Sequence, residues 1–221
     1  MRYQGVLFDL DGTLINSAQD MYIALNLTLT EVAFPIVSYA QVSTWVGNGI
    51  DMLVKRGLSG GIEINTELPQ VLVDVAIATF KGHYKLLAGQ YVNLYPNVVT
   101  GLAALSGFSK SVVTNKDRMF TEPLLERLKL TSHFEALVCG DDGQKKPAAQ
   151  PLLQACEKMG LKPHEVIMVG DSKSDILAAH NANIDVIALT YGYHQGVNLQ
   201  EFNPQYLCDD FLDIIPILTQ R

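Results

Sequence analysis

Two aspartates near the start of the chain, Asp9 and Asp11, stand on either side of a single leucine and follow a short apolar run. The run from Gly5 to Phe8 is bounded by turn residues, which predicts a strand buried on both faces. Asp9 then lies at the carboxyl end of that strand and Asp11 in the loop beyond it. Because ligands of open α/β sheets bind at this edge, the pair predicts a reactive site.

The two carboxylates suit two different steps of phosphoryl transfer. Asp9 is ionised at neutral pH, since the ordinary pKa of aspartate is about 3.9, and it can attack phosphorus to form an aspartyl phosphate. Asp11 can protonate the leaving alkoxide and then take a proton from the water that hydrolyses the intermediate. We therefore interpret Asp9 as the nucleophile and Asp11 as the general acid and base.

Two further segments carry groups that can stabilise a transferring phosphoryl group. Thr114 and Asn115 follow a predicted strand, and Lys146 precedes Pro147. The Thr114 hydroxyl and the backbone amides of Leu10 and Asn115 can donate hydrogen bonds to phosphate oxygens, while Lys146 offsets the charge that builds on them. Thr114, Asn115 and Lys146 are therefore the predicted phosphate-binding residues, and loss of Lys146 should lower kcat.

A cluster of carboxylates facing a phosphate dianion requires a hard divalent cation, and Mg²⁺ is the predicted one. It prefers a few carboxylate oxygens together with water and substrate phosphate. Asp9, Asp171 and the backbone carbonyl of Asp11 can supply those ligands. Asp175, one helical turn beyond Asp171, is expected to support them through water or through Lys146.

The predicted elements place these residues in an α/β fold. Residues 16–87 have helical periodicity, with Ser17 as the expected N-cap of the first helix. The remaining chain alternates short apolar runs with helical segments, which predicts a Rossmann-like parallel sheet. We expect a core domain of residues 1–15 and 88–221, interrupted after its first strand by an inserted α-helical cap domain of residues 16–87. The expected strands are 5–8, 111–113, 136–139, 166–169, 186–189 and 206–208. The expected helices between them include 120–128 and 151–159.

Composition limits the classes of protein that fit. The 221 residues are 48% hydrophobic and 18% charged, as in soluble globular proteins. The formal net charge of −7, without a long basic run, argues against nucleic-acid or membrane binding. No apolar run reaches the roughly 18 residues that span a bilayer, and the N-terminus lacks the apolar part of a secretory signal. The three cysteines are widely spaced and indicate reduced thiols. We expect a cytoplasmic monomer or homodimer.

The chemical segments resemble, in type and order, the four motifs of the haloacid dehalogenase superfamily. They are Asp9-Leu10-Asp11-Gly12-Thr13, Thr114, Lys146-Pro147 and Gly170-Asp171-Ser172-x-x-Asp175. Segments 45–49, 140–147 and 190–193 are further similar to the bacterial phosphoglycolate phosphatases. The resemblance implies Mg²⁺-dependent hydrolysis of a small phosphomonoester, foremost 2-phosphoglycolate. It also favours Lys146 over Lys145, because Lys146 directly precedes the proline. Asn16 and Ala149 depart from the common pattern, at positions that do no chemistry.

The turn Gly47-Asn48-Gly49 in the cap has two readings. Gly47 can end one helix, and Asn48 with Asp51 resembles a capping box that opens the next. Alternatively, free amides near Asn48 and Gly49 can bind a substrate carboxylate at the helix N-terminus. Arg56 lies far along that helix and is not expected to be a ligand, whereas Trp45 is expected in the cap core.

Other functions of the same fold remain open at this point. A phosphosugar mutase passes the phosphoryl group to a sugar, and related phosphatases act on sugar phosphates or nucleoside monophosphates. A halide-releasing dehalogenase needs no acid at position 11, so Asp11 argues against it. A binding protein without turnover is disfavoured because every expected chemical side chain is present.

Overall fold

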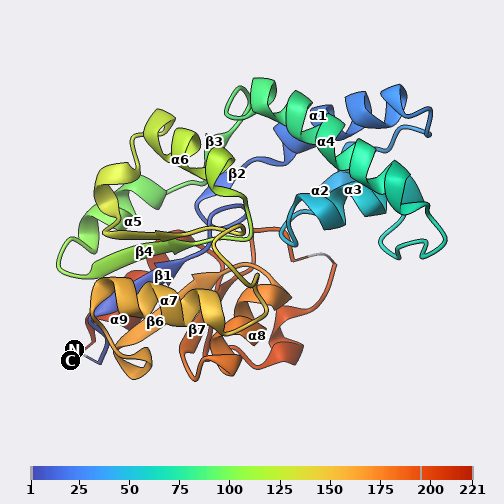
Figure 1. Cartoon of the computed structure of the whole chain (residues 1–221). Coiled ribbons are helices and arrows are strands. Elements are labelled where there is room, and N and C mark those ends of the chain that lie inside the picture. Colours follow the sequence, from blue (N-terminus) through green and yellow to red (C-terminus); the bar gives the residue numbers. More distant parts are fainter. Residues whose placement is uncertain (1, 195, 221) are drawn as a thin grey trace.

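The computed structural model describes residues 2–194 and 196–220, and its centre is a six-stranded parallel sheet (Figure 1). The strand order is β5-β4-β1-β6-β7-β8. This confirms the predicted α/β class, with the first strand at the middle of the sheet. The strands are β1 (Gly5–Phe8), β4 (Ser109–Val113), β5 (Ala136–Val138), β6 (Val166–Gly170), β7 (Asp185–Leu189) and β8 (Tyr206–Cys208).

Helices cover both faces of this sheet, which explains the continuous apolar run of β1. Val6 and Phe8 pack under α5, α6 and α9, whereas Leu7 packs under α7 and α8. All four residues of β1 are buried. The helices of the core are α5 (Val98–Ala104), α6 (Arg118–Arg127), α7 (Gln150–Met159), α8 (Lys173–Asn181) and α9 (Ile214–Thr219).

Four further helices form a separate layer above the carboxyl edge of the sheet (Figure 1). They share an apolar core to which Phe120 of α6 and Tyr193 also contribute, and Trp45 is buried in it as expected. Among the described residues, no helix is long and apolar enough to cross a membrane. The four helices are α1 (Ala18–Glu31), α2 (Tyr39–Ser43), α3 (Ile50–Ser59) and α4 (Gln70–Leu87).

The chain passes between the two layers through a small antiparallel ribbon that the sequence did not indicate. Strand β2 (Ile15–Asn16) pairs with β3 (Asn93–Leu94). Two-residue strands leave too little periodicity to detect, so this pairing arises from tertiary contacts. The division at residues 15/16 and 87/88 stays a prediction, with the ribbon spanning the first of these boundaries.

Helix α1 begins at the predicted position, but its N-terminus is satisfied differently. The Ser17 hydroxyl does not cap the helix and instead donates to Asp11 Oδ1. The amides of Ser17 and Ala18 donate to the hydroxyl of Tyr193, at 2.9 and 3.0 Å. Ser17 is therefore the N-cap residue, as expected, but its side chain does not cap the helix, because the hydroxyl of a tyrosine from the core accepts from the first amides.

The chain returns from the cap to the core after α4, and this segment is held by Asp20, a fully buried carboxylate in the first turn of α1. Its oxygens accept hydrogen bonds from the amides of Gly89, at 2.6 Å, and Tyr91, at 2.9 Å. Burial raises the pKa of Asp20, while the two amide donors act in the opposite direction. Asp20 thus ties the returning chain to the start of the cap.

We predict that Asp20→Ala lowers the free energy of unfolding by about 2–3 kcal/mol, because it leaves two amides without an acceptor. Urea unfolding followed by circular dichroism measures the change. The matched control is Asp74→Ala, since Asp74 is exposed on α4 and accepts only from Gln70; its effect should stay within about 0.5 kcal/mol. Equal effects of the two substitutions would contradict the assignment.

Candidate active site

The predicted reactive groups meet at one edge of the sheet because their strands are neighbours. Strand β1 pairs with β4 on one side and β6 on the other, with Phe8 opposite Val112 and Val169. Asp9 is therefore level with Val113 and Gly170, and Thr114 and Asp171 follow one residue further along the adjacent strands. All three are buried, at 6%, 3% and 1% exposure.

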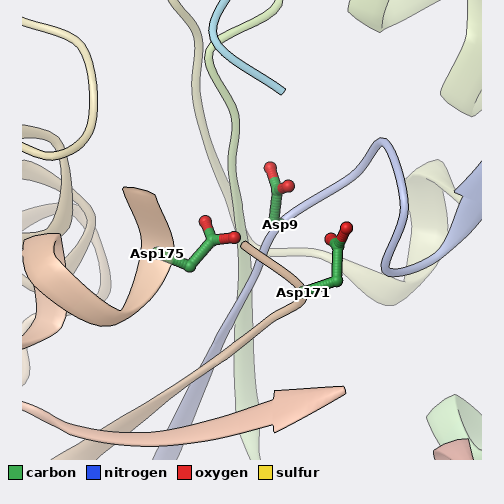
Figure 2. Close-up of side chains that lie close together, drawn as sticks. All are labelled: Asp9, Asp171 and Asp175. Carbon is green, nitrogen blue, oxygen red and sulfur yellow. The ribbon is translucent and has the colours of Figure 1, made fainter. Parts of the chain in front are cut away.

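Three carboxylates converge at this edge (Figure 2). Asp9, Asp171 and Asp175 each offer an oxygen, and these three oxygens lie within 4.8 Å of one another. Asp171 Oδ1 accepts from the Thr13 hydroxyl and Oδ2 from the Tyr193 amide, both at 2.6 Å. These contacts orient the Asp171 carboxylate toward the cluster.

Lys146 is the cation within the cluster. Its Nζ lies 2.7 Å from Asp9 Oδ1, from Asp175 Oδ1 and from the Val113 carbonyl oxygen. Burial lowers the pKa of Lys146, but the carboxylates of Asp175 and Asp9 outweigh it, so the net pKa is raised. Lys145, by contrast, is partly exposed and lies 3.9 Å from Asp117. The structure therefore places Lys146, and not Lys145, among the carboxylates.

The charges in the cluster do not balance without a further cation. Three carboxylates and one ammonium leave a formal charge of −2. Burial raises the pKa of Asp9 to about 7, and burial together with the neighbouring Asp9 raises that of Asp171 well above its usual range. A buried all-oxygen donor set with this charge fits Mg²⁺. Asp175 already binds Lys146 and the Ser172 hydroxyl, which agrees with its expected supporting position.

Asp11 points into a second ion pair that sequence reasoning missed. Its Oδ1 and Oδ2 lie 2.9 and 2.7 Å from Nζ of Lys116, and both side chains are buried. Burial lowers the pKa of Lys116, yet Asp11 and Tyr84 raise it above its ordinary value. The side chain of Asp11 is thus occupied, leaving its backbone carbonyl for the predicted metal contact. The only signal in the sequence is the position of Lys116 directly after Thr114 and Asn115.

Asn115, in the loop after β4, connects the loop that carries Lys146 with the cap turn at Gly47. Its Oδ1 accepts from the amide of Lys146 at 2.8 Å, and its Nδ2 donates to the carbonyls of Lys146 and Gly47 at 3.0 and 3.1 Å. Thr114 Oγ1 accepts from the amide of Lys116 at 3.2 Å. The Thr114 hydroxyl proton is therefore available to a phosphate oxygen.

A cleft lies between the cap and the sheet edge. The cap contributes apolar side chains and glycines, and the core contributes polar groups. Its lining residues are Asp9, Asp11, Met21, Val46, Gly47, Gly49, Ile50, Leu53, Thr114, Asn115 and Lys116. Of the predicted cap residues, Gly47 and Gly49 line the cleft.

Asn48 connects the cap to the core instead of capping a helix. Its Nδ2 donates to the Ser174 hydroxyl at 3.0 Å, and its Oδ1 accepts from Arg56 at 2.9 Å. Helix α3 has Gly49 as its N-cap, with no side-chain cap, so the expected box of Asn48 with Asp51 is wrong. Gly49 has a φ of +86°, and a Cβ there would lie 3.0 Å from Lys145 Nζ.

Arg56, which was not expected to be a ligand, reaches back to the turn at the start of its helix. Helical side chains point toward the N-terminus of their helix. Nη1 of Arg56 accordingly donates to the Trp45 carbonyl at 2.8 Å as well as to Asn48. The buried guanidinium therefore fixes the shape of the turn that borders the cleft.

The fold and the site together define a class: a Rossmann-like α/β protein with a buried aspartate at the end of its first strand, further carboxylates and a lysine around it, and a helical cap over it. The family model for haloacid dehalogenase-like hydrolases matches residues 6–189. The chain belongs to this family.

Individual relatives cover nearly the whole chain. A phosphoglycolate phosphatase of Colwellia psychrerythraea is 39% identical over 213 residues, which are 95% of this chain and 94% of that protein. The phosphoglycolate phosphatase of Salmonella typhimurium is 36% identical, over 97% of this chain and 92% of that protein. The crystal structure of a predicted phosphoglycolate phosphatase from Haemophilus somnus superposes with a TM-score of 0.90 at 34% identity, covering 99% of both chains.

We predict that Mg²⁺ stabilises the protein more at pH 8 than at pH 5.5. Because the pKa values of Asp9 and Asp171 are raised by folding, metal-free stability is full at low pH and declines as pH rises through about 7. The cation competes with the bound protons, and at a hundred times its Kd it adds about 2.7 kcal/mol. Thermal unfolding with and without MgCl₂ measures both effects.

The control is Asp171→Asn. This variant removes one carboxylate, so its metal-free form should be at least as stable as the wild type while MgCl₂ no longer shifts its Tm. A normal magnesium shift in this variant would contradict the site.

Proposed function

We propose that this protein is a Mg²⁺-dependent phosphatase that hydrolyses 2-phosphoglycolate to glycolate and phosphate through an aspartyl phosphate on Asp9. The observation that carries the proposal is the buried cluster of Asp9, Lys146 and Asp171 at the cleft, in a chain 36–39% identical to named phosphoglycolate phosphatases over nearly its full length. The three cysteines of the chain are buried and free, which supports a cytoplasmic protein.

The first chemical step is the attack of Asp9 on phosphorus. Lys146 binds Oδ1, which leaves Oδ2 as the attacking oxygen. The bond between phosphorus and the bridging oxygen breaks, and Asp11, which must take up a proton before this step although it pairs with Lys116 in the free protein, gives that proton to the departing alkoxide. Thr114 donates to a phosphoryl oxygen and Lys146 offsets the charge that develops. Bound Mg²⁺, held by Asp9, Asp171 and the Asp11 carbonyl, would neutralise phosphate charge.

The second step returns the enzyme to its starting state. Asp11, now a carboxylate, takes a proton from water as the water oxygen attacks phosphorus. The bond from phosphorus to Asp9 breaks, and inorganic phosphate leaves. The apolar cap residues, such as Val46 and Leu53, exclude other water from the cleft.

The lining of the cleft favours a small acid over a sugar phosphate. The cap contributes Met21, Val46, Ile50 and Leu53, none of which has a side chain that bonds sugar hydroxyls. A mutase or a nucleotidase would require such polar contacts on the cap side. A phosphorylated two-carbon acid has no hydroxyl groups, and its one carboxylate can be met by polar groups on the core side of the cleft.

We predict that Asp9→Asn reduces kcat by at least about 10³-fold, because the amide cannot form the covalent intermediate. Hydrolysis of 2-phosphoglycolate and of p-nitrophenyl phosphate with Mg²⁺, followed by phosphate release, measures the loss. The variant should retain its fold, checked by circular dichroism. A wild-type protein inactive on both substrates would overturn the proposal.

We further predict that kcat/KM for 2-phosphoglycolate exceeds that for sugar phosphates and nucleoside monophosphates. A panel of these substrates, assayed side by side at equal Mg²⁺, provides the test. In ¹⁸O-labelled water, one labelled oxygen should enter the phosphate released. Retention of the phosphoryl group on a sugar bisphosphate would indicate a mutase instead.

A further inference from the structure

Lys116 is a buried cation on the wall of the cleft that the reaction above does not use. Its side chain is 2% exposed, and its Nζ contacts both carboxylate oxygens of Asp11. Its Nζ also lies 5.1 Å from the centre of the Tyr84 ring. Within the part of the chain that the structure describes, it is the only lining residue with a cationic side chain.

The position of Asp11 brings the substrate's second anionic group close to this lysine. Asp11 must contact the bridging oxygen of the phosphomonoester in order to protonate it. In 2-phosphoglycolate, a single methylene separates that oxygen from the carboxylate. Because Lys116 lies 2.7 Å from Asp11, a bound substrate places its carboxylate within reach of the ammonium.

None of the cap side chains that line the cleft carries a charge, and the ammonium of Lys145, which lies close to Gly49, does not line the cleft. Met21, Val46, Ile50 and Leu53 are apolar, and Gly47 and Gly49 carry no side chain. Burying a carboxylate against such a surface without a counter-charge is costly. The backbone amides at the start of α3 remain the alternative.

We propose that Lys116 recognises the carboxylate of the substrate and thereby determines specificity for a phosphorylated acid with one methylene between its two anionic groups. An ammonium has three N–H donors, so it can bind Asp11 and the substrate carboxylate together. Without substrate, Asp11 neutralises the buried charge. The assignment rests on the proposed function, because it uses the same general acid and the same substrate.

The test compares 2-phosphoglycolate with ethyl phosphate, in which a methyl group replaces the carboxylate. In Lys116→Met, the ratio of kcat/KM for the two substrates should fall at least about 30-fold, because a buried charge pair is lost. Lys116→Arg should restore most of the ratio. Lys81→Met is the matched control, since Lys81 pairs with Asp117 outside the cleft lining, and it should keep the wild-type ratio.

Rates on both substrates should fall in Lys116→Met, because Asp11 loses its partner, and the ratio separates recognition from positioning. Equal losses of kcat/KM for the two substrates, which leave the ratio unchanged, would overturn carboxylate recognition by Lys116 and leave the proposed function standing. A wild-type enzyme without preference for 2-phosphoglycolate would overturn the proposed substrate as well.

In Lys116→Met the carboxylate of Asp11 is buried without a partner, so a second comparison removes that carboxylate as well. In Asp11→Asn, calorimetry should show tighter binding of 2-phosphoglycolate than of ethyl phosphate. In the double variant Asp11→Asn with Lys116→Met, that difference should disappear. Its persistence would assign carboxylate binding to the amides of α3 instead.

Discussion

The contact of one ammonium with two carboxylates and a strand end is the interaction on which the rest of the site depends. Lys146 contacts Asp9 directly after β1, the end of β4 and Asp175 on α8. Its own backbone is bound on both sides by Asn115. Removal of a buried partner from such a network leaves uncompensated charge, which is far more destabilising than loss of a surface pair.

The Asp-x-Asp pair can exist at close range because each aspartate has its own lysine. Lys146 approaches Asp9 from the loop before α7, and Lys116 approaches Asp11 from the loop after β4. The two aspartates are therefore held in two separate ion pairs, as the separate roles proposed for them require. The negative charge that remains belongs to Asp171 and its neighbours, the cluster proposed to hold the divalent cation.

The elements that carry the site could be predicted from sequence because their signals are local. The apolar run of β1 fixes the strand, and its end fixes the position of Asp9. Thr114 and Asp171 follow similar runs, and the parallel order brings the three ends together. Their catalytic and binding roles stay predictions.

The contacts that cross between loops could not be predicted in the same way. A lysine in a loop is usually solvated, so nothing local indicates that Lys116 is buried against Asp11. Asn48 and Ser17 both have side chains that commonly cap helices, yet Asn48 bonds Ser174 on the core and Ser17 bonds Asp11 in the loop after β1. Local sequence indicates which hydrogen bonds these side chains can make. Which partner they bind depends on the loops that lie next to them at the edge of the sheet.

Tyr193 links the cap to the active-site edge of the core, and this link limits how the cap can be exchanged between related enzymes. Its amide holds Asp171, while its hydroxyl receives the first amides of the helix that opens the cap. The preceding Gly192 leaves no space for a Cβ beside Asp171. If the cap were replaced by that of a relative, the start of α1 would keep these contacts only if residues 192 and 193 were exchanged as well, although they lie far from the cap in the sequence. The residues that determine substrate choice in this architecture therefore do not form one continuous segment.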